Sequence, residues 1–385
     1  MKVDQSITHL KIGIDARLYG PGHAGIGRYI QKLIEGLAAI DGKNEYFIFL
    51  DRAGFAVFEV PGANFKKVLA DYPVYSVKEQ LQLPYLLAKY KLDLVHFPHF
   101  NVPWFYRRPF VVTIHDLIIS HYPDSRATTL PLVLYRLKLF FYRLTVKSAA
   151  KRAATIITVS QFSKDDIVNS LKIRPEKISI TYEGYDPPLD RSSDCRQVLE
   201  RFNLNHNYLL YVGSAYPHKN LDNLLHAFRY LIQDHDQLQL VLVGKETFFY
   251  QKLKQQIDDS GLTGRVILTG FVDDNDLACL YAGAEAYVFP SLIEGFGLPP
   301  LEAQSYDLPV VSSNATCLPE ILGQSALFFD PNDPYEITQK IKTVLHDHLL
   351  REDLIRRGRE NLKRYSWSVL ARNTLNIYRQ IFKGN

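Results

Sequence analysis

Short, almost wholly apolar runs recur along the chain, and each is followed by a longer segment of mixed polarity. Runs of this length that are rich in Val, Ile, Leu and Phe are typical of parallel strands covered on both faces. The segments between them, such as residues 220–233, space apolar residues three and four apart, as one face of a helix does. The alternation predicts two α/β domains, each a doubly wound, Rossmann-like sheet. The runs lie at residues 11–18, 46–50, 92–98, 110–116, 155–160, 178–184, 208–214, 238–244, 265–272, 286–291, 309–314 and 326–330.

The two predicted domains meet at a stretch rich in turn-forming residues. The sequence GYDPPLDRSSD brings prolines, charges and serines together before a new strand begins at Tyr208. Such a composition is typical of a linker. We therefore place an N-terminal domain at residues 1–185 and a C-terminal domain at residues 186–365. The tail, residues 366–385, has helical spacing and is expected to complete the N-terminal domain.

The composition is that of an ordinary globular protein, with 46% hydrophobic and 22% charged residues among 385. The start carries Asp4 and no apolar segment like that of a signal peptide, and no window approaches the roughly 18 apolar residues that span a bilayer. We expect a cytoplasmic protein that is not integral to a membrane. Its cysteines, Cys195, Cys279 and Cys317, are isolated and odd in number. This argues against a disulfide framework and a zinc site, so buried thiols are expected.

Positive charge is concentrated in the first half of the chain. Residues 1–185 hold 25 Lys and Arg against 16 Asp and Glu, whereas residues 186–385 hold 20 against 25. Within it, a predicted helix from Arg136 to Arg152 contains no acid and combines a basic face with Leu and Phe. This pattern fits a helix that rests on the anionic inner face of a membrane. It also fits a domain helix whose basic side faces the solvent. Nucleic acid is disfavoured, because aromatic residues are not interleaved on the basic face.

The segment EGFGLPPLE, from Glu294 to Glu302, places two carboxylates around a glycine turn and a double proline, directly behind an apolar run. Pro299 and Pro300 have the fixed φ and the missing N–H that suit the first positions of a helix. We expect a helix N-terminus at the sheet edge, with Glu302 in its first turn. Unpaired N–H groups favour a phosphate there, and the two acids then suit the hydroxyls of a sugar and a ribose. The alternative is a helix with acids that merely favour its dipole.

A lysine in the second half has the position of a phosphate ligand. In YVGSAYPHKN, Gly213 and Ser214 end the first strand of the C-terminal domain, and Lys219 opens the next helix. A lysine at a helix N-terminus opposes the dipole, so an anionic ligand would explain it better than stability does. An exposed lysine without a role is the alternative.

Two features of the first half lie at the carboxyl edge of its predicted sheet, where ligands of open α/β sheets bind. One is a glycine loop that contains Gly25 and leads into a helix expected near Arg28, and the other is His115 at a strand end. A histidine satisfied by its own loop is the alternative for the latter. The glycines also satisfy GxGxxG, but the acid of the next strand, Asp51, lies 31 residues beyond Gly20, where about 20 is usual. A nicotinamide oxidoreductase is therefore disfavoured.

The pair Asp274 and Asp276 has the Asp-x-Asp pattern that holds a metal in other transferases. It lies where a strand ends and a helix begins, so capping of the helix N-terminus accounts for these acids. No group of His, Cys and Asp has the ligand spacing of zinc or of a second metal. We expect neither a metal nor another cofactor.

Together these motifs resemble those of the family 4 retaining glycosyltransferases, whose two-domain architecture is called GT-B. The resemblance covers nearly the whole chain and rests on AGIGRY, TIHDL, IITVSQFSKDDI, YVGSAYPHKN and, above all, EGFGLPPLE, which matches the Glu-x7-Glu signature of that family. It implies two Rossmann-like domains that face each other across a cleft where a nucleotide sugar binds. Residues 1–185 would be the acceptor-side domain, and residues 186–365 would be the nucleotide-sugar-binding domain. The catalytic residues that it implies are His115, Lys219 and Glu294.

The resemblance also implies how the nucleotide sugar is held. Gly25 would lie near the pyrophosphate and Lys219 on it, Glu302 would bind the ribose, and His115 would touch the transferred sugar near the reacting carbon. Many members of the family carry arginine where this chain has Ser214, so charge neutralisation would fall mainly on Lys219 and the helix N-terminus. The binding residues implied are Gly25, Ser214, Lys219, Glu294, Gly295, Phe296, Gly297, Leu298 and Glu302.

The expected reaction is metal-independent transfer of a hexose, with retention, to a glycan or a lipid-linked acceptor in the synthesis of a cell-surface polysaccharide. The leaving phosphate is expected to help deprotonate the acceptor, and the paired glutamates are not expected to act as a glycosidase pair. GDP-mannose is favoured because similar chains are described as mannosyltransferases, although no residue decides the base or the sugar. The alternatives are a nucleotide-sugar epimerase or hydrolase on the same fold and a non-catalytic sugar-binding protein.

Overall fold

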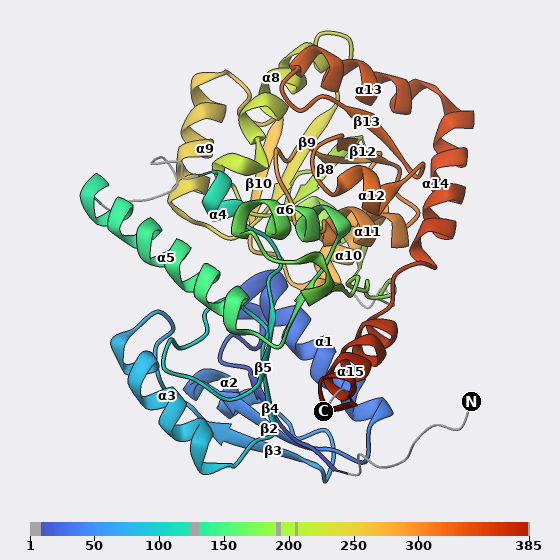
Figure 1. Ribbon diagram of the computed structural model, residues 1–385. Helices are drawn as coiled ribbons and strands as arrows, with labels where there is room; N and C mark the ends of the chain where they lie inside the picture. The colour runs from blue at the N-terminus through green and yellow to red at the C-terminus, as the bar shows by residue number, and fades with distance from the viewer. Residues whose placement is uncertain (1–8, 123–130, 190–193, 205–206, 384–385) are drawn as a thin grey trace. The chain divides into compact units, whose positions relative to one another are not determined.

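The structure is a computed structural model with two compact units, each built on one parallel sheet that alternates with helices, as the sequence predicts (Figure 1). It describes residues 9–122, 131–189, 194–204 and 207–383. The first unit comprises Met1–Ser120, Leu132–Gly184 and Ser366–Asn385, and the second comprises His121–Pro131 and Tyr185–Tyr365.

Seven strands form the sheet of the first unit, in the order β3-β2-β1-β4-β5-β6-β7, and every pair is parallel. Six of them match predicted runs, whereas β3 was missed. This strand lies at the edge of the sheet, and its two exposed lysines, Lys66 and Lys67, interrupt the apolar pattern. The strands are β1 (Lys11–Asp15), β2 (Glu45–Leu50), β3 (Phe65–Leu69), β4 (Leu94–Phe97), β5 (Phe110–Thr113), β6 (Thr155–Thr158) and β7 (Ile178–Ile180).

The helices of the first unit include one from the far end of the chain. Helix α15 (Trp367–Lys383) packs against α1 (Ala24–Ile40), and Figure 1 shows the two side by side in red and blue. The contact is close, because a Cβ on Gly36 would lie 2.6 Å from the Cβ of Ala371. The other helices are α2 (Arg52–Val57), α3 (Val77–Lys89), α4 (Ile118–His121), which ends at the boundary of the unit, α5 (Leu132–Arg152) and α6 (Gln161–Leu171), with 3₁₀ turns at Pro21–His23 and Pro175–Lys177.

Six parallel strands form the second sheet, in the order β10-β9-β8-β11-β12-β13, and all six match predicted runs. The strands are β8 (Tyr208–Val212), β9 (Gln239–Val243), β10 (Val266–Gly270), β11 (Ala286–Phe289), β12 (Val310–Ser313) and β13 (Ala326–Phe329). The helices are α7 (Cys195–Arg201), α8 (Leu221–Leu231), α9 (Phe248–Asp259), α10 (Asp274–Gly283), α11 (Leu298–Ser305), α12 (Leu318–Leu322), α13 (Pro334–His346) and α14 (His348–Leu362), with a 3₁₀ turn, η4, at Pro217–Lys219.

Burial explains the apolar runs. Every residue of the inner strands β4, β5, β11 and β12 is buried, since helices cover both faces of each sheet. The first core contains Ile12, Ile14 and Ile48, among others, and α15 contributes Leu370 and Tyr378 to it. A chain that alternated apolar and polar residues could not have filled both faces of such a sheet.

Each sheet has one place where the strand order reverses. In the first unit this switch point lies between β1 and β4, and in the second it lies between β8 and β11. Loops that leave two such neighbouring strands turn to opposite faces of the sheet and leave a crevice at their carboxyl ends, which is where open α/β sheets bind ligands. The two switch points therefore define where a site is expected in each unit.

Two local predictions are wrong. Helix α1 begins at Ala24 and not near Arg28, so Gly25 and Gly27 lie within its first turn. Two of the three cysteines are not isolated thiols: Cys195 and Cys279 form a disulfide across 84 residues, and only Cys317 is a free, buried thiol. The pairing arises because α7 packs against α10, and spacing in the sequence carries no sign of that contact.

The structure also bears on membrane insertion. Within the described ranges of the chain, no helix is both long enough and apolar enough to cross a bilayer.

Candidate functional site

The segment from Glu294 to Leu298 forms the turn between β11 and α11 at the second switch point. Gly297 has φ of 101°, a left-handed conformation that favours glycine, and it caps α11. A Cβ there would also lie 3.0 Å from Leu318. Pro299 and Pro300 follow in the first turn of α11, as the sequence predicts. The helix thus starts at the carboxyl edge of the sheet, and because prolines carry no N–H, the N–H groups at this end are those of Gly297 and Leu298.

Glu294 and Lys219 are joined by an ion pair. The Nζ of Lys219 donates to Oε1 of Glu294 over 2.6 Å, although the two residues are 75 positions apart. Their side chains are only 17% and 10% exposed, so the pair is largely shielded from water. The ammonium also lies 5.7 Å from the ring centre of Phe289, at the end of β11. The structure therefore brings together the two residues on which the sequence placed most of the chemistry of the C-terminal domain.

Hydrogen bonds tie the turn that carries Lys219 to the turn that carries Glu294. Asn220 has φ of 60° and donates from Nδ2 to the carbonyl of Pro290, and Leu292 donates its N–H to the carbonyl of His218. Lys219 itself ends the 3₁₀ turn η4 and precedes α8, so it lies just outside the helix that it was expected to open. Lys219 is thus held in the loop between β8 and α8, which the hydrogen bonds of Asn220 and Leu292 attach to the neighbouring turn.

The loop after β12 holds the backbone of the segment that carries Glu294. The N–H of Glu294 donates to the hydroxyl of Thr316, and the thiol of Cys317 donates to the carbonyls of Glu294 and Phe296. Burial raises the pKa of Cys317 well above its ordinary value, and the charge of Glu294 adds to this effect. The thiol therefore stays protonated and can act as a donor to both carbonyls.

Glu302 lies deeper in α11 than expected. The helix begins at Leu298, so Glu302 is beyond its first turn, where no acid occurs. The prediction of Glu302 in the first turn is therefore wrong, because the helix starts directly after Gly297. Its carboxylate accepts a hydrogen bond from the hydroxyl of Tyr281 over 3.2 Å. Ser214, the other residue predicted on this side, follows β8, and its carbonyl accepts from the hydroxyl of Tyr211.

His115 lies two residues beyond β5 in the first unit. Its Nε2 is 3.1 Å from the carbonyl of Pro98, and its Nδ1 is 3.2 Å from a carboxylate oxygen of Glu183. A carbonyl and a carboxylate only accept, so both ring nitrogens carry a proton. Burial alone would lower the pKa of His115, but the hydrogen bond and the charge of Glu183 outweigh it and raise that pKa. The ring is thus an imidazolium, with Tyr29 packed edge-on at 4.7 Å.

Glu183 is a candidate functional residue that was not identified from the sequence. It is 5% exposed and follows β7, at the same sheet edge as His115. The sequence contained one usable signal, because Glu183 ends a predicted apolar run and acids at strand ends are site candidates in an α/β sheet. The partner of that acid, 68 positions away, could not be read from the sequence.

Close packing in the glycine segment of the first unit, residues 20–27, requires the absence of a side chain at Gly27 and not at Gly25. A Cβ on Gly27 would lie 2.0 Å from the carbonyl oxygen of Gly20, whereas a Cβ on Gly25 would meet no atom within 4 Å. Gly27 is therefore required for the close approach of α1 to the loop. Gly25 faces open space, which leaves room for a ligand to approach the backbone.

The acids at the start of α10 have structural partners. Asp273 caps the helix by accepting from the N–H groups of Asn275 and Asp276, and Asp276 pairs with Arg201 over 2.7 Å. Capping therefore accounts for this segment, as predicted. In the part of the chain that the structure describes, no three His, Cys, Asp or Glu side chains gather as a metal site requires.

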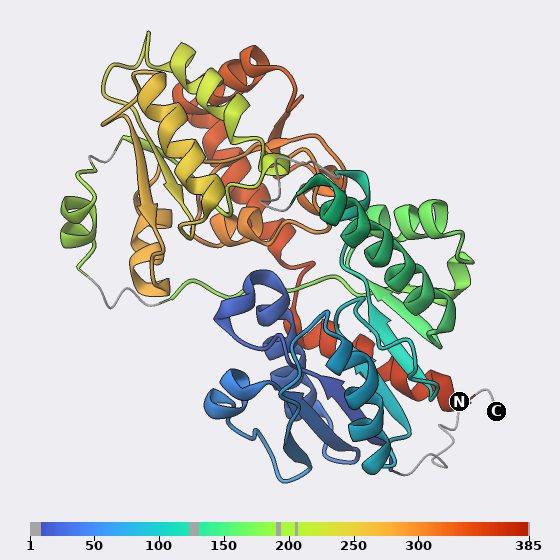
Figure 2. The same ribbon diagram turned by 90° about the vertical axis from the view of Figure 1, so that its left-hand side faces the viewer.

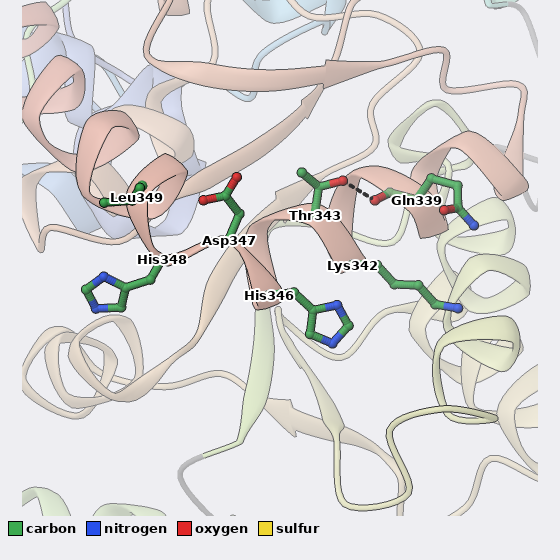
Figure 3. Close-up of a pocket in the computed structure, with 7 residues that line it drawn as sticks. All are labelled: Gln339, Lys342, Thr343, His346, Asp347, His348 and Leu349. Carbon is green, nitrogen blue, oxygen red and sulfur yellow. Dashed lines mark hydrogen bonds between the residues drawn. The ribbon is translucent and has the colours of Figure 1, made fainter.

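A hollow where α13 ends and α14 begins contains none of the predicted residues. Thr343 donates to the carbonyl of Gln339 within α13, and Lys342 pairs with Asp234. These are contacts of an ordinary helix surface, and we assign the hollow no role. Its lining residues, drawn in Figure 3, are Gln339, Lys342, Thr343, His346, Asp347, His348 and Leu349.

Two family models match most of the chain between them. The model described as Glycosyltransferase Family 4 matches residues 23–188, and the model described as Glycosyl transferases group 1 matches residues 197–361. O-antigen chain mannosyltransferase B of Escherichia coli is 31% identical over 375 residues, which cover 92% of this chain and 96% of that protein. The chain belongs to the family 4 glycosyltransferases.

Other comparisons agree with this membership and with the GT-B fold. The O-antigen chain mannosyltransferase RfbU of Salmonella typhimurium is 30% identical to this glycosyltransferase over 300 residues, 77% of this chain and 78% of that protein. The sucrose-phosphate synthase of Thermosynechococcus elongatus superposes with a TM-score of 0.78 at 20% identity, over 98% of this chain and 100% of that one. WaaG, a glycosyltransferase involved in lipopolysaccharide biosynthesis, superposes with a TM-score of 0.72 at 17% identity, over 96% and 99% of the two chains.

Proposed function

We propose that this glycosyltransferase transfers a hexose, with retention and without a metal, from a nucleotide-diphosphate sugar to a glycan or lipid-linked acceptor in polysaccharide synthesis. The observation that carries the proposal is the shielded Lys219–Glu294 pair at the switch point of the second sheet. The ammonium supplies positive charge for a diphosphate, and the carboxylate supplies acceptors for sugar hydroxyls. The backbone N–H groups of Gly297 and Leu298, just before the two prolines of α11, suit an oxygen of the same ligand.

The remaining residues take the roles that the family resemblance implies. The backbone from Gly295 to Leu298 and the carboxylate of Glu294 both bind the transferred sugar, and Glu302 binds the ribose. Gly25 lies near the pyrophosphate. Because Ser214 carries no charge, Lys219 and the start of α11 neutralise the charge of the pyrophosphate.

His115 acts on the transferred sugar through its positive charge, because Glu183 and Pro98 already accept from its two N–H groups. As an imidazolium it cannot accept a proton, so it cannot be the general base of the reaction. A fixed positive charge beside the sugar can instead stabilise negative charge that develops on neighbouring oxygens.

The reaction then needs no protein nucleophile. The bond between the anomeric carbon and the diphosphate oxygen breaks, and the acceptor oxygen bonds to that carbon on the same face. The acceptor proton passes to the leaving phosphate, whose developing charge Lys219 stabilises.

GDP-mannose is the favoured sugar donor, because the relatives of this chain in Escherichia coli and Salmonella typhimurium are O-antigen chain mannosyltransferases. We test this with a thermal-shift panel of UDP, GDP and ADP sugars. A donor at a hundred times its Kd stabilises the protein by about 2.7 kcal/mol, so the correct one raises the melting temperature most. Labelled GDP-mannose, with and without acceptor, then separates transfer from hydrolysis and epimerisation. Loss of transfer in excess chelator would contradict the metal-independent reaction.

The inner face of a membrane is the proposed location, and α5 is the proposed contact. This helix, which faces the viewer in Figure 2, exposes a row of apolar side chains beside Arg136, Lys138, Arg143 and Lys147. A basic helix that also exposes apolar side chains can bind anionic lipid through both its charges and those side chains. The exposed apolar residues are Val133, Leu134, Leu137, Phe140, Phe141 and Leu144.

A further inference from the structure

A chain of hydrogen bonds crosses the core of the first unit, from α15 to α1. The hydroxyl of Tyr378, in α15, lies 2.6 Å from Nδ1 of His96, in β4, although 282 positions separate the two residues. Nε2 of the same ring lies 2.8 Å from Oγ1 of Thr113, the last residue of β5. That oxygen in turn lies 3.1 Å from the hydroxyl of Tyr29, in α1. We call these four side chains the core polar chain.

Each link of the core polar chain depends on the link before it. All four side chains are fully buried. Burial, together with the charge of His115, lowers the pKa of His96 to about 3, so its ring is neutral and carries one proton. The phenol of Tyr378 belongs to an apolar core, where a hydroxyl proton without an acceptor would be costly, so it donates to Nδ1 of His96. The proton of the ring is then on Nε2 and is donated to Thr113.

The core polar chain ends against His115. The ring centre of Tyr29 lies 4.7 Å from that of His115, with the two planes at 88°. The hydrogen bonds of His115 to Glu183 and Pro98 start from its two nitrogens, so they restrain the ring mainly along the line between these atoms. Tilting about that line is opposed by the ring of Tyr29. The hydrogen bond to Thr113 fixes Tyr29 in turn.

Stability alone does not explain four polar side chains in a row through this core. Apolar residues of the same shape fill such a space at no loss of stability, whereas a buried polar network specifies one arrangement of its members. We propose that Tyr378 is a positioning residue for the transfer reaction, which acts through the core polar chain on the orientation of the His115 ring. The inference rests on the proposed function, which places the transferred sugar against His115.

Substitutions that remove one hydroxyl and keep the shape of the side chain test this role. We expect Tyr378→Phe and Thr113→Val each to lower kcat about three- to tenfold, the effect of one hydrogen bond. Thr113→Ser keeps the hydroxyl and should retain the kcat of the wild type. The KM for GDP-mannose should not change, because the groups proposed to bind it belong mainly to the second unit. Transfer from GDP-mannose to methyl α-mannoside, measured well below the melting temperature, gives both constants.

A double variant separates positioning from a general loss of stability. Tyr378→Phe and Thr113→Val interrupt the same chain, so together they should lower kcat no further than either does alone, whereas independent effects would multiply. Tyr46→Phe is the matched control. It removes an equally buried hydroxyl from the same core, at the start of β2, where the phenol donates to Asp41. This variant should keep the kcat of the wild type.

The ring of His115 can be observed without any substrate. In protein labelled with ¹⁵N in its histidine rings, we expect the resonances of His115 to shift in Tyr378→Phe and to stay in place in Tyr46→Phe. Unchanged resonances of His115 in folded Tyr378→Phe would overturn the inference. So would an equal fall of kcat in Tyr46→Phe, since this would attribute the effect to lost stability.

The outcomes separate this inference from the proposed function. An unchanged kcat in both folded Tyr378→Phe and Thr113→Val contradicts the inference and leaves the proposed function standing. A wild-type protein that neither binds nor transfers from any nucleotide sugar contradicts the proposed function, while the resonances of His115 still report whether Tyr378 holds its ring.

Discussion

The ion pair between Lys219 and Glu294 limits what each residue can do alone. A shielded ammonium and carboxylate at 2.6 Å hold each other in place, so removal of either leaves a charge without its partner. The pair is neutral as a whole, and its ammonium is the part that would attract a diphosphate. We therefore expect the two residues to act as one unit in the proposed binding of a nucleotide sugar.

Loss of either member should slow the reaction strongly. We expect Lys219→Ala and Glu294→Ala each to lower kcat by about a hundredfold or more, the usual effect of removing a group that stabilises developing charge. Steady-state transfer from GDP-mannose measures this. Lys363→Ala, at a side chain 69% exposed, is the control and should leave kcat unchanged. Near-normal turnover in either of the first two variants would contradict the assignment.

The pair of His115 and Glu183 should make stability depend on pH. The pKa of His115 is raised in the folded protein, so the pair stabilises it fully below about pH 6.5, the ordinary pKa of histidine, and this contribution disappears as the pH rises through the raised pKa. We expect Glu183→Gln to lower the free energy of unfolding by about 1–3 kcal/mol at pH 6 and by less at pH 9.

Urea denaturation of wild type and variant at the two pH values measures this difference. Glu176→Gln is the control, because Glu176 is an exposed carboxylate in the 3₁₀ turn Pro175–Lys177. We expect this variant to keep the stability of the wild type at both pH values. An equal loss of stability at pH 6 and pH 9 would show that Glu183 does not hold a charged imidazole.

At the level of elements, helix α1 requires glycine at one position of its loop and tolerates a side chain at another. Gly27→Ala would force a Cβ against the carbonyl of Gly20, and neither backbone segment can move away easily. We expect Gly27→Ala to destabilise the protein by about 1–3 kcal/mol, as overpacking does, and Gly25→Ala to change stability by less than about 1 kcal/mol. Thermal denaturation of the two variants checks this.

Gly25→Ala should affect binding and not folding. If its backbone lies near the pyrophosphate, the added methyl group should raise the KM for the nucleotide sugar. An unchanged KM together with an unchanged melting temperature would remove Gly25 from the site.

Helix α5 should bind anionic lipid through its exposed apolar row. Burial of a large apolar side chain contributes about 1.5–3 kcal/mol, so the double variant Leu137→Glu, Phe140→Glu should weaken binding to phosphatidylglycerol vesicles by on the order of a hundredfold. Vesicle flotation measures the bound fraction. Leu349→Glu, at a leucine 77% exposed in the second unit, should have no effect. Equal flotation with neutral phosphatidylcholine would contradict the electrostatic part of this contact.

At the scale of the whole molecule, the disulfide between Cys195 and Cys279 closes a long segment of the second unit. A loop of 84 residues corresponds to a stabilisation of about 4.5 kcal/mol in the chain-entropy view. We therefore expect dithiothreitol to lower the melting temperature of the second unit, and the double variant Cys195→Ser, Cys279→Ser to be insensitive to it. Three titratable thiols in the denatured, unreduced protein would show that the bridge does not form.

The sequence by itself determined the succession of strands and helices and the segments that carry the chemistry. Apolar runs report local burial, and twelve of the thirteen strands follow from them, whereas the half-exposed edge strand β3 does not. The turn at Gly297 and the two prolines after it could be predicted in the same way, because their backbone preferences are local.

Only the tertiary structure decided which of these residues are partners. The pairs Lys219–Glu294, His115–Glu183 and Cys195–Cys279 are separated by 75, 68 and 84 positions. The order of strands in a sheet, and the packing of α7 on α10, set which loops meet, and no local pattern encodes that order. For the same reason the charge of His115 emerged only from the fold, since it depends on Glu183, which a distant loop places beside the ring.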